Sequence, residues 1–475
     1  MDQDTTPVLD AISQYRDQGN HTFALPGHRL GEGIDERTAS VLSRGAFQAD
    51  VITAKQAVPD AERLLADAVG ARDAVFTTCG SSISIHTAML TVTGPGQKIL
   101  VDRNVHKSVV ASLVLAGATP VWLRPRWDHD RQIAHPATAD DVDAALRRDP
   151  DVSAVLMITP TEYGTGADVR GVAEICHGRG IPLVVDEAWG AHFPFHPGMP
   201  TAAVRAGADL AVQSLHKADG GLCQASVILL GGDLVDPVEL RLRLDLITTT
   251  SPSALMFGSI DGFRHRMVVE GRQLLDDALD RANGLRARLS KVAGLTVMDE
   301  SIIGQDGVAE WDPLKLSVEV SELGITGYQA KEWLQEQKQL TVQLGDARRI
   351  VCSLTYSDDD KAIERLAEAL EALAAEPPQD DRPAPHVPEL EDLNLEQAMT
   401  PREAFFARTE QVTDPVGRIS AEMISPYPPG VPAILPGERF NPAVVDYLRA
   451  GLAAGMTLPD AADPTLKTFR VVQGG

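Results

Sequence analysis

The sequence predicts an α/β protein whose mostly parallel sheet is covered by helices on both faces. Between about residues 60 and 265, apolar runs such as "KILVD" and "IPLVVDEAW" alternate with helical patterns such as "HKSVVASLVLAG". Strands that alternate with helices of about 10–15 residues are typical of a parallel sheet. Two further observations complete the prediction: a smaller region mixes strand and helix patterns, and a proline-rich segment separates it from the C-terminal part.

These patterns divide the chain into five parts. Residues 1–50 form an N-terminal arm, because a short helical pattern is followed by "FALPGHRLGEG", whose Gly and Pro interrupt regular structure. Residues 51–265 form the large domain and residues 266–375 a smaller α+β domain. The segment 376–390, rich in Pro and Asp, reads as a linker, and residues 391–475 form a C-terminal α+β domain.

The charge of the chain argues against nucleic acid as a partner. With 475 residues, a formal net charge of −24 and a pI near 4.9, the protein would repel a phosphate backbone. The acidity either attracts cationic small molecules or, as we favour, keeps the protein soluble. A composition of 44% hydrophobic and 23% charged residues is that of a globular protein with ample core.

The cysteines and the N-terminus point to a cytoplasmic protein. The N-terminus has neither a basic region nor an apolar region typical of a signal peptide. The apolar run 109–123 is too short and too interrupted to span a bilayer, so no membrane association is predicted. Four cysteines fit neither a zinc site nor a disulfide framework, so we predict reduced thiols and no metal: Cys79, Cys176, Cys223 and Cys352.

Polar residues follow several predicted strands, where ligands bind in parallel α/β sheets. Ser81 and Ser82 open a helix after the strand "AVFTT", and backbone N–H groups with hydroxyls at a helix N-terminus can hold a phosphate. Asp186 ends the strand "IPLVVDEAW", and "LAVQSLHK" ends the next with Lys217. Each feature alone has an ordinary reading: a helix cap, a carboxylate capping a turn, or a solvated surface lysine.

Together these residues predict a site for pyridoxal 5'-phosphate. A lysine forms a Schiff base with the aldehyde of this cofactor, so Lys217 is the predicted reactive group. A carboxylate must keep the ring nitrogen protonated, because the pyridinium withdraws electrons during the reaction, and Asp186 is placed for this role. One helix and one strand separate Asp186 from Lys217, which would bring both side chains to one ring.

Six segments, in the right order, resemble blocks of one known family. They are "FALPGHRLGEG", "DRNVHKSVVASLVLAGATPVWLRP", "DEAWGAHFPFHPGMP", "SLHK", "TTSPSALMFGSIDGFRHRM" and "GRISAEMISPYPPGVPAILPGE". The chain resembles the prokaryotic ornithine/lysine/arginine decarboxylase family, whose members have the aspartate aminotransferase fold (fold type I). The resemblance covers nearly the whole length and implies that residues 51–265 bind the cofactor.

The resemblance assigns roles by position. Lys217 would bind the cofactor and Asp186 would pair with its ring nitrogen. Ala188 would lie under the ring, Trp189 would donate its indole N–H to the ring oxygen, and His106 would stack on the opposite face. An ordinary helix-start histidine is the alternative for His106. The phosphate would be held by Ser81, Ser82, Ser214 and His216.

The substrate half of the pattern is less regular. Glu422 and the loop 426–430 would lie near the distal end of the substrate, although a solvated Glu422 is an equal alternative. Glu162 stands where the family commonly has an aromatic residue, and Ala254 replaces a common tyrosine. Cys79 precedes "GSS" in place of the usual context, and "KADGG" replaces a more apolar segment. Glu162 and Glu422 are the candidate partners for a cation on the substrate.

The resemblance implies decarboxylation of ornithine, lysine or arginine to the amine and CO2, a carboxy-lyase reaction of polyamine metabolism. The proton at Cα would come from His216 or Lys217. Two alternatives stay open: another reaction on the same cofactor (oxidative decarboxylation or deamination, or transamination), and a non-catalytic cofactor-binding homologue. The resemblance also implies a homodimer or larger homo-oligomer with active sites at the interface, and the stiff segment "SPYPPGVPAILPGE" fits a packed surface.

Overall fold

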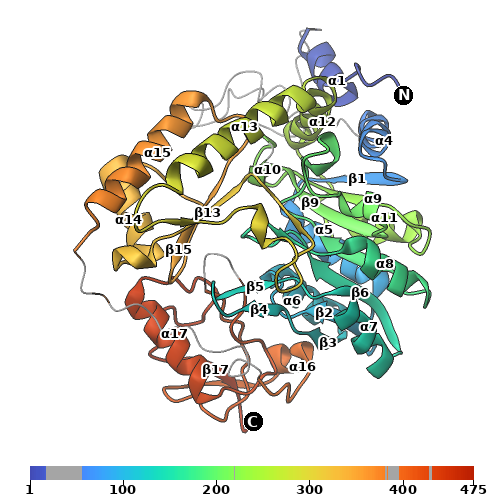
Figure 1. Ribbon diagram of the computed structural model, residues 1–475. Helices are drawn as coiled ribbons and strands as arrows, with labels where there is room; N and C mark the ends of the chain where they lie inside the picture. The colour runs from blue at the N-terminus through green and yellow to red at the C-terminus, as the bar shows by residue number, and fades with distance from the viewer. Residues whose placement is uncertain (18–55, 219, 380–381, 383–394, 427–430) are drawn as a thin grey trace. The chain divides into compact units, whose positions relative to one another are not determined.

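Contacts divide the chain into two compact units, each built from two stretches of sequence. The first unit comprises Met1–Thr91 and Val184–Leu275, and the second comprises Val92–Leu183 and Asp276–Gly475. The five-part division made from sequence stays a prediction. The computed structural model (Figure 1) describes residues 1–17, 56–218, 220–379, 382, 395–426 and 431–475.

Four strands of the central sheet belong to the first unit, in the order β1-β10-β9-β8. They are β1 (Asp73–Thr77), β10 (Ser226–Leu230), β9 (Leu210–Ser214) and β8 (Leu183–Asp186). β8 and β9 pair in parallel, whereas β10 pairs antiparallel with both β9 and β1. Every residue of β8, β9 and β10 is buried, as expected for continuous apolar runs in a sheet covered on both faces.

Helices of the first unit follow the patterns read from sequence. Gly80, with φ of 78°, begins α5, and Asp236 caps α11 by accepting a hydrogen bond from the Val238 N–H at 2.8 Å. The helices are α1 (Pro7–Asp17), α4 (Val58–Val69), α5 (Gly80–Val92), α9 (Ala203–Ala206), α10 (Leu215–Ala218), α11 (Pro237–Ile247) and α12 (Ala254–Val269), with the 3₁₀ turn η2 (Phe193–Phe195).

Backbone groups of the N-terminal segment, including the start of α1, bind a buried ion pair within α12. Asp261 accepts from Arg264 at 2.7 Å, and both side chains are 0% exposed. Asp261 also accepts from the Val8 N–H at 2.9 Å, while Arg264 donates to the carbonyls of Gln3 and Thr5 at 2.7 and 2.5 Å. These extra hydrogen bonds offset the cost of burying two charges. The segment "FALPGHRLGEG", expected to fold onto another surface, lies outside the described residues.

The second unit contributes the strands β6-β2-β3 to the central sheet, and all of these pairings are parallel. The strands are β6 (Val152–Ile158), β2 (Lys98–Asp102) and β3 (Thr119–Leu123). The prediction of an α/β fold with a mostly parallel sheet is confirmed. The helices that alternate with these strands are α6 (Lys107–Ala116), α7 (Ala139–Arg148) and α8 (Val169–His177).

A second, antiparallel sheet has the order β11-β13-β15-β14, and α14 lies against β14 and β15 and beside α15 (Figure 1). The strands are β11 (Thr296–Val297), β13 (Lys315–Glu319), β15 (Arg349–Ser353) and β14 (Leu344–Gly345). The helices are α13 (Gly271–Leu289), α14 (Gly327–Lys338) and α15 (Asp360–Ala375), and α13 has residues in both units. Two 3₁₀ turns are η3 (Glu300–Ile302) and η4 (Ser321–Leu323). Two short ribbons pair β12 (Glu310–Trp311) with β7 (Thr165–Gly166) and β4 (Arg126–Asp128) with β5 (Ile133–His135).

The C-terminal part has its own apolar core. Helix α17 (Pro442–Ala454) packs Val444 and Leu448 against Phe440 and Phe469, whose rings meet edge to face at 5.5 Å. This mixture of helix and strand agrees with the α+β character expected from sequence. The other elements here are α16 (Pro401–Phe406) and the antiparallel pair β16 (Thr409–Val412) and β17 (Phe469–Val472).

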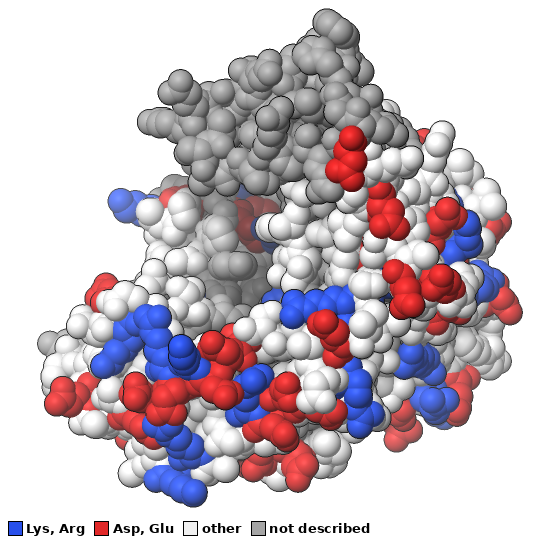
Figure 2. Space-filling view, turned by 90° about the horizontal axis from the view of Figure 1, so that it is seen from above, with Lys and Arg blue, Asp and Glu red and all other residues white. Residues whose placement is uncertain are grey.

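The surface charges are mixed in sign on the face seen in Figure 2. Acidic and basic side chains lie interspersed there, so the excess of acidic residues does not form one continuous field on that face. This distribution fits the solubility interpretation of the net charge of −24. Among the described residues, no helix is long and apolar enough to cross a membrane.

Asp102 at the end of β2 predicts a dependence of stability on pH. Burial raises the pKa of Asp102 to about 7, although the Ile158 N–H donates to Oδ2 at 3.1 Å. In the unfolded chain its pKa is about 3.9, so the folded protein binds this proton more tightly and loses stability as the pH rises from about 4 to about 7. The slope is at most about 1.4 kcal/mol per pH unit.

We expect Asp102→Asn to flatten this slope, because asparagine keeps an acceptor for Ile158 but does not ionise. Urea unfolding of both proteins across the window measures the effect. Asp140→Asn, an exposed change on α7, is the matched control and should leave the slope as in the wild type. Equal slopes for Asp102→Asn and wild type would show that Asp102 does not titrate in this range.

Candidate active site

Lys217 lies in the short helix α10, directly after β9. Its Nζ lies 4.2 Å from the centroid of the Trp189 ring, and the side chain is half-buried. The helix ends in a tight turn in which the Gly221 N–H donates to the Leu215 carbonyl at 3.0 Å. A Cβ at Gly221 would come within 2.8 Å of the Leu215 Cβ, so this turn requires glycine. The ring contact makes a fully solvated surface lysine the poorer reading.

Asp186 is a buried carboxylate at the end of β8. It is 3% exposed, and burial raises its pKa, while the nearby charge of Lys217 and the Ala188 N–H, which donates to Oδ1 at 3.2 Å, act in the opposite direction. A cation close to such a carboxylate favours its ionised form. A protonated pyridine nitrogen is such a cation, so the residue fits the predicted role.

The turn after β8 is fixed by hydrogen bonds to β9. The Glu187 N–H donates to Val212 at 3.0 Å, and the Ser214 N–H donates to Ala188 at 3.4 Å. The Glu187 carboxylate accepts from Gln213 Nε2 at 2.6 Å and from the Ala203 N–H at 2.7 Å. Sequence reasoning missed Glu187 and Gln213 as positioning residues. The consecutive Asp-Glu at a strand end was their only signal.

Glycine at position 190 is a steric requirement of the same turn. A Cβ at Gly190 would lie 2.7 Å from the Glu187 Cγ and 2.7 Å from the Phe193 ring. Ala188, predicted to lie under the cofactor ring, is buried, and Trp189 is half-buried beside Lys217. The "DEAWG" block therefore holds the carboxylate and the indole in one fixed turn.

The hydroxyl side chains of the first unit divide into two groups, and only the second contains residues predicted to hold the phosphate. In the first group, Ser84 Oγ forms hydrogen bonds with Thr77 Oγ1 at 2.8 Å and with Ser226 Oγ at 2.9 Å. These three hydroxyls therefore already have partners in the protein. In contrast, Ser214 Oγ is buried without a hydrogen-bond partner among the described residues. A buried hydroxyl in this state is costly, and a phosphate oxygen would satisfy it. Ser81 and Ser82 lie in the first turn of α5, where backbone N–H groups suit an anion.

The surroundings of His216 favour its neutral imidazole form. Burial and the charge of Lys217 lower its pKa, and the Ala225 carbonyl, 3.3 Å from Nδ1, opposes them. Because a carbonyl only accepts, Nδ1 carries the hydrogen and Nε2 keeps a lone pair. His216 is thus better suited to accept a hydrogen bond than to supply a proton.

His106 and Glu162 belong to the second unit. His106 caps α6, and its Nδ1 accepts from the Ser108 N–H at 3.3 Å. This geometry agrees with the helix-start alternative, and stacking on a cofactor ring stays a prediction. Glu162 lines a cavity of the second unit together with Tyr163. Ala254 is buried at the start of α12, and Cys79 is a partly buried free thiol.

The alternative of a solvated Glu422 is wrong. The side chain is 6% exposed, one carboxylate oxygen accepts from the Arg470 N–H at 2.6 Å, and the other accepts from the Ala462 N–H at 2.6 Å. Burial raises its pKa. These contacts fix two segments of the C-terminal part. The substrate contact of Glu422 stays a prediction, and residues 427–430 of the neighbouring loop lie outside the described residues.

One group of side chains has a spacing that would suit a metal ion: Asp128, His135 and Asp306. Asp128 already accepts from Arg131 Nη1 at 2.8 Å and from the Arg131 N–H at 2.8 Å, and it lies 3.4 Å from His135 Nε2. Thr165 Oγ1 is 3.2 Å from His135 Nδ1. Because Arg131 neutralises Asp128, we read the group as a structural network.

Family models for Orn/Lys/Arg decarboxylases match the chain in two parts. The major domain matches residues 6–362, and the C-terminal domain matches residues 388–462. The chain belongs to the Orn/Lys/Arg decarboxylase family. Its cofactor is therefore pyridoxal phosphate, and its reaction is the decarboxylation of a basic amino acid, as the sequence predicted.

Two bacterial arginine decarboxylases match this decarboxylase along nearly their whole lengths. The arginine decarboxylase of Bacillus subtilis is 35% identical, covering 100% of this chain and 99% of the relative, and that of Halalkalibacterium halodurans is 35% identical, covering 99% and 98%. Among solved structures, the constitutive lysine decarboxylase of Escherichia coli superposes with a TM-score of 0.80 at 20% identity, covering 99% of this chain and 82% of that one. This likeness confirms fold type I.

Asp186 gives the first test of the site. We expect Asp186→Asn to lower kcat by about 10²–10⁴-fold, because the amide cannot keep the ring nitrogen protonated. The decarboxylase should still take up cofactor, measured by its absorbance. Asp236→Asn, an exposed cap of α11 that asparagine also supports, is the control. Near wild-type turnover in Asp186→Asn would show that another group serves the nitrogen.

Proposed function

We propose that this decarboxylase acts on arginine and releases agmatine and CO2. The support for arginine is the similarity to relatives named arginine decarboxylases, of which four are 34–35% identical over at least 93% of this chain. A relative named as a lysine decarboxylase is only 24% identical. The observation that carries the chemistry is the buried Asp186 beside the half-buried Lys217 in one unit.

From these contacts we assign a role in the reaction to each residue of the site. When bound, pyridoxal phosphate supplies an electron sink for the bond that breaks. Asp186 keeps the ring nitrogen protonated, and Ser81, Ser82 and Ser214 hold the phosphate. Trp189 limits the position of the Lys217 side chain. The carboxylate leaves as CO2 more readily from a site that excludes water.

Lys217 is the proposed source of the proton that replaces CO2 at Cα. Its amine carries transferable hydrogens at Nζ. His216 instead keeps its hydrogen on Nδ1, 3.3 Å from the Ala225 carbonyl, and burial lowers its pKa. His216 Nε2 is then an acceptor, and a protonated phosphate oxygen is a donor that would fit it.

Product analysis tests the substrate. We expect CO2 and agmatine from arginine, with kcat/KM for arginine at least about tenfold above that for lysine or ornithine, which corresponds to about 1.4 kcal/mol of transition-state binding. Lys217→Ala, colourless and inactive, is the control. A keto or aldehyde product would show a different reaction on this cofactor, which the unusual Cys79, Glu162 and Ala254 would then explain. A preference for lysine would overturn the arginine proposal alone.

We also propose that the protein is a cytoplasmic homodimer of polyamine metabolism. Helix α11 supports the dimer, since it exposes one apolar stripe: Val238 at 62%, Leu242 at 54% and Leu246 at 74%. Residues spaced by four lie on the same side of a helix. Apolar stripes of this kind commonly mark a protein interface.

The assembly has a direct test. We expect the wild type to have the mass of a dimer by light scattering, and Leu246→Asp to shift it toward monomer with a matching loss of activity. Val416→Asp, in a loop of the second unit where the side chain is 43% exposed, is the control and should leave the mass unchanged. A fully active wild-type monomer at nanomolar concentration would refute the dimer. A dimeric Leu246→Asp would place the interface elsewhere.

A further inference from the structure

A cavity of about 540 Å³ lies within the second unit, and its described lining includes none of the residues predicted to bind the cofactor or the substrate. It adjoins the carboxyl ends of two parallel strands, because Arg103 directly follows β2 and Arg124 directly follows β3. Helix α7 adds Arg148, and the C-terminal part adds Glu438. Ligands bind at the carboxyl ends of parallel strands, and pockets of about 300–1,000 Å³ hold small molecules.

Both acidic side chains of the lining are already paired with arginines. Glu438 Oε1 accepts from Arg103 Nε at 3.2 Å, and Glu438 Oε2 accepts from Arg103 Nη2 at 2.9 Å. Asp141 accepts from Arg126 Nε at 2.8 Å and from Arg126 Nη2 at 2.7 Å. Two-point pairs of this kind are among the strong charge-assisted contacts. Neither carboxylate is therefore left to neutralise the other arginines of the cavity.

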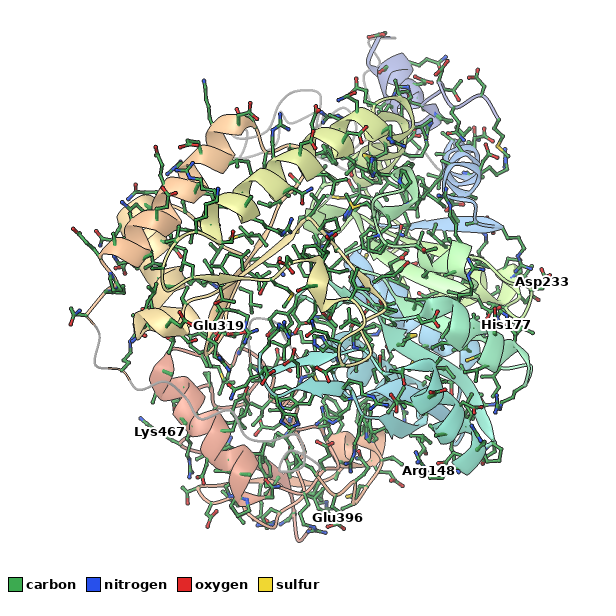
Figure 3. All side chains as sticks on the ribbon, in the orientation of Figure 1. Arg148, His177, Asp233, Glu319, Glu396 and Lys467 are labelled. Atoms are coloured by element: carbon green, nitrogen blue, oxygen red, sulfur yellow. The ribbon has the colours of Figure 1, made fainter. Side chains whose placement is uncertain are left out.

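Two arginines of the lining carry a positive charge that the protein does not fully balance. No hydrogen bond or ion pair joins Arg124 to another described residue. Arg148, labelled in Figure 3, ends α7, and its Nε lies 3.6 Å from Asp149 Oδ2. The same carboxylate already accepts from Lys98 Nζ at 3.1 Å. A chain with 67 acidic and 43 basic residues thus gathers positive charge in this cavity, and an anion would balance it.

Apolar side chains form much of the remaining lining. Trp122 and Leu395 are half-buried there, and Leu123 is buried. The indole of Trp122 is held in place, because its N–H donates to Gln397 Oε1 at 3.0 Å and the guanidinium carbon of Arg103 lies 5.6 Å from its ring centroid. A fixed aromatic wall of this kind can pack against a planar or apolar group of a ligand.

We propose that this cavity binds a small phosphorylated molecule other than the cofactor, with Arg124 and Arg148 on the phosphate and Trp122 against the organic part. A phosphate group carries about −1.5 to −2 charges at pH 7, which matches two guanidinium groups. Each guanidinium presents its N–H groups in a fixed fork that fits phosphate oxygens. The cavity has room for more than a free phosphate ion, so the phosphate belongs to an organic molecule.

Calorimetric titration with phenyl phosphate tests the site. The cofactor is first fixed to the full chain with borohydride, so that the residues that hold its own phosphate stay occupied. We expect phenyl phosphate to bind, and more weakly as the salt concentration rises, because the main contacts are ionic. Inorganic phosphate should bind at least about tenfold more weakly, since it has no group to pack on Trp122. No binding of either compound at millimolar concentration would overturn the proposal.

Arg124→Gln distinguishes this cavity from any other anion site. Arg124 is exposed, so the change removes the charge without disturbing the core. We expect Kd for phenyl phosphate to rise at least about tenfold, and Arg148→Gln to act in the same way. Arg147→Gln, an exposed change on α7 beside the cavity residue, is the matched control and should leave Kd unchanged. Unchanged Kd in the double variant of Arg124 and Arg148 would refute the proposal.

Succinate tests whether the cavity selects phosphate among dianions. Its two carboxylates carry a similar charge, but a flexible chain separates them, so fixing them between two arginines costs more entropy. We expect succinate to bind at least about tenfold more weakly than phenyl phosphate. Equal affinity for the two would refute the assignment to a phosphate. These titrations measure binding alone, so their outcome is independent of the substrate that the decarboxylase uses.

Discussion

The active site depends on one carboxylate that is held out of water. Asp186 ends a strand whose residues are all buried, and burial alone favours its protonated form. The nearby charge of Lys217 and a single backbone N–H offset this only in part. The fold therefore favours a cation beside the carboxylate at the end of β8, and in the proposed site the ring nitrogen of the cofactor would be that cation. Glu187, Gln213 and Gly190 keep the carboxylate in place by fixing the turn that follows.

Sequence reasoning could name the groups proposed to act on the cofactor because each of them follows an apolar run. Asp186 ends β8, and Lys217 lies in the helix directly after β9; the apolar pattern of both strands can be read from the sequence, and ligands bind at strand ends in parallel sheets. The alternation of strands and helices likewise predicted the central sheet. The antiparallel placement of β10 between β1 and β9 could not be read in this way, since a continuous apolar run does not show strand direction.

Residues whose hydrogen-bond partners lie far away in the sequence were not predicted as positioning residues. Glu187 looked like a companion of Asp186, yet its partners lie 16 and 26 positions away, and nothing local indicates them. The sequence could not show that Glu422 is buried, because a carboxylate that accepts hydrogen bonds from two backbone N–H groups has no sequence signature.

The ion pair beneath α1 makes the extreme N-terminus part of the fold. Arg264 is fully buried, and two of its acceptors are main-chain carbonyls of the first five residues. A protease that cut after Thr6 would strip those acceptors from a guanidinium that cannot lose its charge. The resulting protein would keep α1, which begins at Pro7, but Arg264 would keep Asp261 as a partner and lose both main-chain acceptors. Trimming this end is thus equivalent to a core mutation, although no core residue changes.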